Sequence, residues 1–242
     1  MNKFSKMGAQ SIIKSFSRTS SMIQNFNRAG IRATEGTLRL EVNLGSSASY
    51  TFQVNENQTK LATEIRLRQG DAFVPTSIGF FLKKAGTSST TAPSDAEQSV
   101  ADIHTFPDST IFSGASEATN LNCMYNGRLQ FNINSVNLTE TIDTLRYKRV
   151  GMAQQGLAVS TAASNNAYLR SQWDSADYGF QTFHQSIALN GQANNLINLL
   201  LPTGVNCAGT SSQNYAVIIL RGTLLINGAG KVEDASIKSF LR

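Results

Sequence analysis

Apolar and polar residues alternate along much of the chain after residue 35, which is the pattern of half-buried β-strands. The clearest examples are Leu38–Leu44 and Tyr50–Val54, which flank a Gly-Ser-Ser break and together predict a β-hairpin. Further along, Glu64–Arg68 alternates charged and apolar residues, whereas Ala72–Leu82 is almost continuously apolar. These patterns predict a chain built mainly of strands.

Asn126-Gly127 is the strongest turn signal, because this dipeptide readily adopts the positive φ angles of a two-residue hairpin. We therefore expect Leu121–Tyr125 and Arg128–Val136 to form a second hairpin. Gly222 lies within an apolar strand pattern and predicts a bulge or a bend. Further strands are expected at Tyr168–Gln172, Tyr178–Phe183, Ser186–Leu189, Leu196–Leu201, Tyr215–Leu220 and Thr223–Ile226.

Helical patterns are scarce in this part of the chain. Only Thr139–Arg149 predicts a helix, with Thr139 as its N-cap. Two polar loops, Ala85–Gln98 and Ala158–Asn166, are rich in Ser, Thr and Ala and are expected on the surface. Short strands joined by such loops predict an all-β jelly-roll β-sandwich over residues 35–242. The body is either one elaborated jelly roll or two small ones in tandem, divided near residues 138–150.

Residues 1–34 follow a helical period instead and are interpreted as a basic, amphipathic N-terminal arm. On a helical wheel the basic side chains share one third of the circle, and the apolar side chains lie opposite. Gly8 and the Ala29-Gly30 pair bracket the stretch, so we expect a helix from about Ser11 to Arg28. The basic residues are Lys3, Lys6, Lys14, Arg18, Arg28 and Arg32, and the apolar face includes Ile12, Phe16, Ile23 and Phe26.

Charge sets the arm apart from the body. Charged residues make up only 15% of the 242 residues, a share that suits strands and loops better than helices. No acidic residue precedes Glu35, so the arm carries the whole formal excess of +5. Three interpretations of the arm stay open. It is a helix that packs on its own body or on a neighbouring subunit, a segment that contacts nucleic acid or phospholipid, or a mitochondrial transit peptide. No apolar run has the length that spans a bilayer.

The chain offers little that is typical of a catalytic site. It lacks the H-E-x-x-H, G-x-S-x-G and G-x-G-x-x-G patterns, and its imidazoles come from His104 and His184 alone. Asp174 and Asp177, beside Trp173, form the best acidic pair. Three residues apart in a turn, they are expected to cap local backbone donors. We therefore expect no catalytic residue, no cofactor and no metal site.

Two cysteines, Cys123 and Cys207, lie far apart in the sequence and belong to no C-x-x-C pair. This spacing gives no support to a zinc ribbon or a thioredoxin-type redox motif. We expect both side chains to be buried, unreactive small hydrophobes, with a disulfide between them as the alternative.

Two segments resemble parts of known virus proteins. Glu64–Lys84, EIRLRQGDAFVPTSIGFFLKK, resembles a segment of the capsid proteins of tailless icosahedral bacteriophages of the Bacteroidetes-phage type, and Tyr215–Asn227, YAVIILRGTLLIN, is similar to their closing strands. The resemblance implies a jelly-roll capsid protein whose arm faces the genome or an internal membrane. It also implies synthesis in the host cytoplasm, a place in the virion, and partners that are copies of itself in capsomers and other virion proteins.

A second class of function stays open. A carbohydrate- or receptor-binding β-sandwich, such as a virion spike or an adhesin, would use Trp173, Tyr168, Tyr178 and Phe180 as an aromatic platform. Such a protein gains nothing from a basic amphipathic arm. The sequence therefore predicts a self-assembling structural virion protein and not an enzyme.

Overall fold

The computed structural model describes residues 30–57, 60–134, 136–137, 142–149, 179–183 and 187–229. Half of the structure is strand and 12% is helical, which confirms the predicted β-rich character. The longer strands are β1 (Arg32–Asn43), β2 (Ser46–Gln53), β3 (Ala72–Ala85), β5 (Arg128–Ile133), β10 (Asn195–Asn206) and β11 (Gln213–Ile226). The shorter ones are β4 (Ile103–His104), β6 (Val136–Asn137), β7 (Ile142–Asp143), β8 (Phe180–Thr182) and β9 (Leu189–Asn190). The helices are α2 (Asp95–Val100) and α3 (Glu117–Leu121), with 3-10 helices η1 (Asn122–Asn126) and η2 (Thr144–Tyr147).

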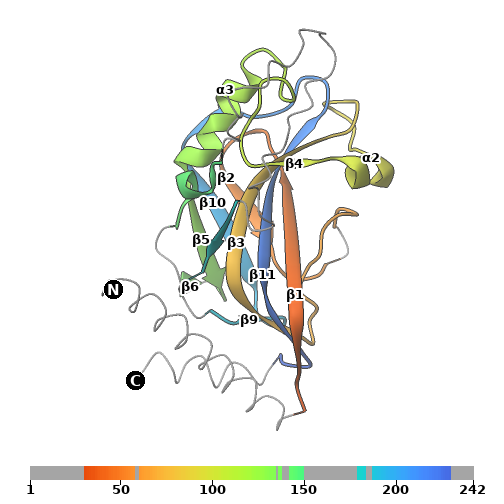
Figure 1. Cartoon of the computed structure of the whole chain (residues 1–242), viewed down its shortest axis with the longest axis vertical. Coiled ribbons are helices and arrows are strands. Elements are labelled where there is room, and N and C mark those ends of the chain that lie inside the picture. Colours follow the sequence, from red (N-terminus) through yellow and green to blue (C-terminus); the bar gives the residue numbers. More distant parts are fainter. Residues whose placement is uncertain are drawn as a thin grey trace, which may run out of the picture.

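The strands form two antiparallel sheets that pack against each other as a β-sandwich (Figure 1). Sheet A has the order β1-β11-β3-β4, and β8 and β9 also pair with β3. Sheet B has the order β2-β10-β5-β6, and β7 also pairs with β5. In both sheets, a strand from the later part of the chain lies between two strands from the earlier part.

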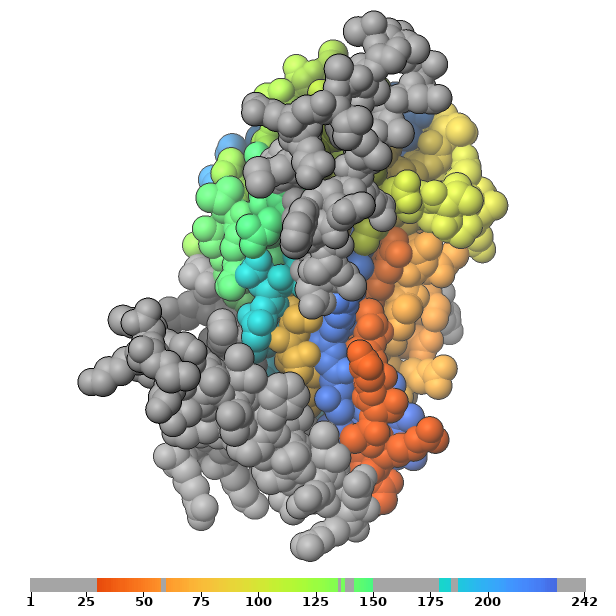
Figure 2. Space-filling view, in the orientation of Figure 1, coloured from red at the N-terminus to blue at the C-terminus, as the bar shows by residue number. Residues whose placement is uncertain are grey.

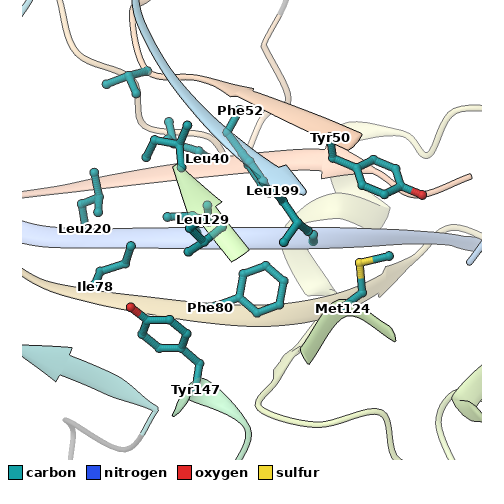
Figure 3. Close-up of a cluster of buried hydrophobic side chains, with 14 of the residues drawn as sticks. Leu40, Tyr50, Phe52, Ile78, Phe80, Met124, Leu129, Tyr147, Leu199 and Leu220 are labelled. Atoms are coloured by element: carbon teal, nitrogen blue, oxygen red, sulfur yellow. The ribbon is translucent and has the colours of Figure 1, made fainter. Parts of the chain in front are cut away.

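Alternating apolar side chains from the inner faces of the two sheets fill the space between them (Figure 3). Tyr125 of η1 is buried in this core, with its ring 5.6 Å from that of Phe80 in an edge-to-face contact. Burying a side chain of this kind contributes about 1.5–3 kcal/mol, so the core is the main source of stability. Sheet A contributes Leu40, Ile78, Phe80 and Leu220, and sheet B contributes Phe52, Leu129 and Leu199.

The hairpin predicted from Leu38–Leu44 and Tyr50–Val54 is wrong. Both strands exist, but β1 pairs with β11 in sheet A and β2 pairs with β10 in sheet B. The chain changes sheets at Leu44-Gly45, where Leu44 N donates to Asn214 O at 2.8 Å. Facing sheets let the apolar sides of both strands bury each other, which an isolated hairpin cannot do.

The hairpin predicted at Asn126-Gly127 is also wrong. Leu121, Met124 and Tyr125 are buried at helical spacing, so the residues before the turn form α3 and η1 instead of a strand. Gly127 has a φ of −97°, outside the positive range that the predicted turn requires. Of the two predicted strands, only the second is present, as β5.

The helix predicted over Thr139–Arg149 is replaced, in its described part, by strand β7 and the single 3-10 turn η2. Asp143 caps this turn, because its Oδ1 accepts a hydrogen bond of 2.9 Å from Leu145 N. Ile142 pairs with Leu129 of β5 and packs against the core. Pairing with a core strand therefore outweighs the local helical pattern.

The alternating pattern of Glu64–Arg68 predicts a strand, but the segment forms only isolated bridges. It covers the edges of two sheets instead. Ile65 exchanges two hydrogen bonds of 2.9 Å with Arg39 of β1, and Leu67 N donates to Val54 O at 2.8 Å. Because β1 and β2 are the edge strands of their sheets, this segment shields part of one open side of the sandwich.

Gly222 lies at a bulge, as predicted. Arg221 pairs with Ser77 and Gly222 with Pro75, which leaves Thr76 as the extra residue of β3. A Cβ atom on Gly222 would come within 2.1 Å of the facing backbone of β3. Glycine is required here because two backbones approach closely.

The polar segment Ala85–Gln98 is largely exposed, as predicted, but its last residues begin α2. Ser94 and Glu97 form a capping box at the start of this helix, and Gln98 is buried. Among the described residues, no helix is both long and apolar enough to cross a membrane. The predicted arm helix, strand Tyr168–Gln172 and loop Ala158–Asn166 lie outside the described residues.

Candidate functional site at the arm end of the sandwich

The arm joins the body at residues 30–32, which we call the arm root. Gly30 has a φ of +73°, a conformation that favours glycine, and it leads the chain into β1. Ile31 is 2% exposed and packs with Ala72 and Leu225 in a small cluster apart from the main core. Its burial contributes about 1.5–3 kcal/mol, so the arm root is firmly attached to the end of sheet A.

A groove of about 530 Å³, here called the end groove, opens near the arm root. A Cβ atom on Gly36 would lie 2.8 Å from Leu224 Cβ, so the glycine leaves room above the floor. Residues of β1, β3 and β11 contribute Gly36, Leu38, Phe73 and Leu224, and the segment from Ile65 to Asp71 lines the other side.

Charged side chains surround this apolar floor. Arg66 Nη2 contacts both carboxylate oxygens of Glu64, at 2.9 and 3.1 Å, and Arg68 is exposed beside them. Asp71 Oδ1 accepts a hydrogen bond of 3.0 Å from Asn227 N, which fixes the end of β11. Because Glu64 neutralises Arg66, Arg68 is the arginine of this rim that stays exposed beside the apolar floor.

A buried ion-pair cluster extends from Glu64 across the outer face of sheet A, where β1, β11 and β3 lie side by side (Figure 2). Lys83 Nζ lies 2.5 Å from Glu41 Oε2, and neither side chain is exposed. Glu41 Oε1 also accepts from Arg39 Nε and Thr63 Oγ1, both at 2.7 Å. Burial lowers the pKa of Lys83, while the Glu41 carboxylate opposes that shift. The cluster holds the segment around Thr63 against the sheet.

The outer face of sheet B has a different character. Two rows of paired residues cross β2, β10 and β5 there, and we call them the amide face. They contain no charged residue, and Thr51 Oγ1 donates to Asn198 Oδ1 at 2.9 Å within them. The next row on this side of sheet B adds one exposed charge, Arg128, which pairs with Leu200. Little electrostatic repulsion would oppose contact between two faces with so few charges. The rows are Gln53, Leu196 and Asn132, and Thr51, Asn198 and Gln130.

Of the arm residues predicted to contact nucleic acid or membrane, Arg32 alone is described. It is exposed at the start of β1 and pairs with Ile226. The other predicted contact residues, Lys3, Lys6, Lys14, Arg18 and Arg28, lie outside the described residues, as do the packing residues Ile12, Phe16, Ile23 and Phe26.

The remaining candidate residues are placed only in part. His104 lies in β4, with its ring 5.7 Å from that of Phe112 in an edge-to-face contact. Phe180 packs on Phe81, with ring centroids 5.4 Å apart, and the Arg221 guanidinium lies 3.7 Å from its centroid. Part of the Phe180 ring is therefore covered by the protein itself. The other candidates, His184, Trp173, Asp174, Asp177, Tyr168 and Tyr178, lie outside the described residues.

The two cysteines, far apart in sequence, come together in the structure. Cys207 is buried, as predicted, but Cys123 is only half-buried, and both are free thiols with their sulfurs 3.3 Å apart. Across the described ranges, no group of three His, Cys, Asp or Glu side chains is arranged to hold a metal ion. No protein-family model matches the chain, and no significant match to a curated protein was found.

Sequence patterns missed the end groove and the ion-pair cluster. Glu41 occupies a polar position in the alternating segment Leu38–Leu44, and Lys83 directly follows the apolar run Ala72–Leu82, so neither looks like a buried residue in the sequence. Their partnership depends on β11 lying between β1 and β3, which is a long-range property of the fold. The groove likewise forms from segments that are far apart in the chain.

Proposed function

We propose that this chain is a structural virion protein, a self-assembling icosahedral capsid subunit with a jelly-roll body and a basic arm that faces the genome or an internal membrane. In this proposal it is a capsid protein of the tailless, Bacteroidetes-phage type and not an enzyme. It is made in the host cytoplasm and ends in the virion, beside copies of itself and other virion proteins.

The nesting of strand pairs is the observation that carries the proposal. β1 pairs with β11, β2 with β10, β3 with β8 and β5 with β7, all antiparallel. The first half of the body thus pairs with the second half in reverse order, as in one long hairpin that is rolled into two sheets. Such an eight-strand arrangement supports a single jelly roll, a fold that viral capsid proteins share with lectins and cupins.

Two further features favour the capsid over the other jelly-roll functions. The arm carries the net positive charge of the chain, and its root is anchored by Ile31 at one end of the sandwich. A charge-bearing arm on one end would place all subunits of a shell in the same orientation toward a polyanion. The amide face offers an uncharged surface for contacts between subunits.

Electron microscopy of the purified full-length chain tests this proposal, together with sedimentation analysis over a range of protein and salt concentrations. We expect closed shells or regular capsomers. A chain that remains monomeric at all conditions contradicts the proposal. Discrete trimers without shells would favour a receptor-binding spike instead.

The role of the arm is tested by replacing Lys14, Arg18, Arg28 and Arg32 with Gln. If the arm binds nucleic acid, each lost phosphate contact lowers the logarithmic salt slope of binding by about 0.9, and four contacts lower it by up to roughly 3.6. Binding to anionic vesicles should weaken by on the order of 1 kcal/mol per residue near the surface. The matched control replaces Phe16 and Ile23 with Ser, which should impair assembly and leave the salt slope intact.

A further inference from the structure

Cys123 and Cys207 form a close pair of thiols, although 84 residues separate them in sequence. Cys123 belongs to η1, and Cys207 follows the last residue of β10. Their Sγ atoms lie 3.3 Å apart, and either can donate a hydrogen bond to the other. The Cys207 side chain also donates to Asn120 O at 3.6 Å.

Hydrogen bonds that do not involve the sulfur atoms hold Cys207 in place and tie its strand to the helical segment before Cys123. Cys207 N donates to Gly45 O at 3.0 Å, and Cys207 O accepts from Asn214 Nδ2 at 3.1 Å. On the other side, Asn120 Nδ2 donates to Asn206 O at 2.9 Å and ties α3 to the end of β10. The two thiols therefore face each other in a fixed setting, which favours bond formation between them over reaction with a distant thiol.

The two sulfur atoms differ in acidity and access. The hydrogen bond between them lowers the pKa of Cys123 and raises the pKa of Cys207, and burial raises the latter further. Cys123 is half-buried, whereas Cys207 is only 1% exposed. Cys123 is thus the thiol that an oxidant reaches and the one that ionises first.

We propose that Cys123 and Cys207 are a redox-sensitive dithiol that closes to an intramolecular disulfide when the protein leaves a reducing compartment. With a small disulfide such as oxidised glutathione, the Cys123 thiolate attacks one sulfur and releases one glutathione thiolate. Cys207 then loses its proton and attacks Sγ of Cys123, which releases the second glutathione. Two protein thiols are oxidised, and one glutathione disulfide is reduced to two thiols.

The position of the pair gives this bond a structural role. The pair lies next to Gly45, at the end of the sandwich opposite the arm root, where α3 is also found (Figure 1). A bond there links the helical segment α3–η1 to β10 and closes a long loop of the chain. The chemistry does not depend on the proposed function. If the arm faces inward in a shell, the bond forms on the outward end after release from the host cytoplasm.

Equilibration of the full-length chain in glutathione buffers of graded ratio tests the proposal, with alkylation and mass spectrometry of the remaining thiols. We expect both thiols to disappear together, with a midpoint in buffers more oxidising than a cytosolic glutathione pool, and one Cys123–Cys207 peptide pair. Independent loss of the two thiols, lasting glutathione adducts on Cys123, or disulfides between chains would overturn it. A disulfide that is already fully formed at the cytosolic ratio of reduced to oxidised glutathione would also overturn the proposal.

Stability supplies a second readout that does not depend on assembly. The oxidised chain should unfold at a higher urea concentration than the reduced chain, because the bond restricts the unfolded state. Cys123→Ser is the matched control, since Cys123 is half-buried and its loss leaves the buried Cys207 in place. This variant should fold and show the same urea midpoint in oxidising and reducing buffers. Equal midpoints for the oxidised and reduced parent chain would contradict the stabilising bond.

Discussion

Lys83 Nζ and Glu41 Oε2 lie 2.5 Å apart on the outer face of sheet A, and both side chains are fully buried. Their strands do not touch directly, because β11 runs between β1 and β3. The ion pair therefore spans the central strand and joins its two neighbours.

Removing one member of this pair should destabilise the fold strongly. Lys83→Met leaves the Glu41 carboxylate buried without its main cation, and breaking such a pair typically costs about 3–5 kcal/mol. Urea unfolding followed by circular dichroism measures the loss. The matched control is Lys60→Met, because Lys60 and Glu56 form an exposed pair at 3.1 Å that is worth roughly 0–1 kcal/mol. An equal fall in the free energy of unfolding of the two variants would show that the buried pair stabilises the fold no more than the exposed pair does.

Alkaline pH should unfold the protein through its buried tyrosines. Burial raises the pKa of Tyr147 to about 12 from an ordinary value of 10.0, and burial also raises the pKa of Tyr125. The unfolded chain therefore releases these protons first, so the stabilisation is complete below pH 10.0 and is lost as pH rises from there to about 12. For Tyr147 alone the loss is about 2–3 kcal/mol.

Tyr147→Phe tests the source of this pH dependence. Within the described residues Tyr147 Oη has no hydrogen-bond partner, so the substitution should change stability little near neutral pH. Thermal unfolding at a series of pH values should show a shallower alkaline decline in the variant. Lys83 has the opposite effect on the pH dependence of stability. Burial lowers its pKa, so the unfolded chain keeps this proton to higher pH and the contribution of Lys83 to stability rises with pH. If parent and variant decline with the same slope, Tyr147 is not the responsible group.

Gly222→Ala should disturb the bulge between β11 and β3. The added Cβ would meet the backbone of the facing strand at 2.1 Å, which a side-chain rotation cannot relieve. We expect the free energy of unfolding to fall by about 1–3 kcal/mol, which is the typical cost of overpacking a core. Gly204→Ala in β10 is the control, since its Cβ would find no atom closer than 3.5 Å. A stable Gly222→Ala variant, measured by thermal unfolding, would mean that the strands can separate there without cost.

The polar loop before α2 should accept short insertions. Ser89 and Thr90 are exposed, so a few residues added between them need not disturb a buried contact. The same insertion between Ser94 and Glu97 would break the capping box and should destabilise α2. Sedimentation and thermal unfolding of both variants distinguish the two sites. Loss of assembly in the first variant, with unchanged folding, would place this loop in a subunit contact.

Local patterns predicted the strands well where apolar residues alternate with polar ones, as in β1 and β2, or run almost continuously, as in β3. They failed where pairing is decided at long range. Leu38–Leu44 and Tyr50–Val54 are adjacent in sequence and alternate alike, so the pattern cannot tell a hairpin from two strands in facing sheets. Asn126-Gly127 carried a strong turn signal, but the helical spacing of the buried residues before it prevailed.

The candidate site was less accessible to prediction than the fold. The unequal charge of the arm is visible in the sequence alone, because it needs no tertiary contact. The close approach of Cys123 and Cys207 cannot be seen in the sequence, because it depends on where β10 ends relative to η1. The end groove depends in the same way on Gly36, Phe73 and Leu224, which come together only when sheet A is complete.

The late position of β11 in the chain has a consequence for how the protein is made. During synthesis, β1 and β3 leave the ribosome long before β11, which must insert between them to complete sheet A. Until then, both strands expose apolar faces and unpaired edges, and such non-local pairing is slow. Chains cut short before residue 213 would lack the central strand of sheet A. Unfinished copies are thereby excluded from any assembly that requires a closed sandwich.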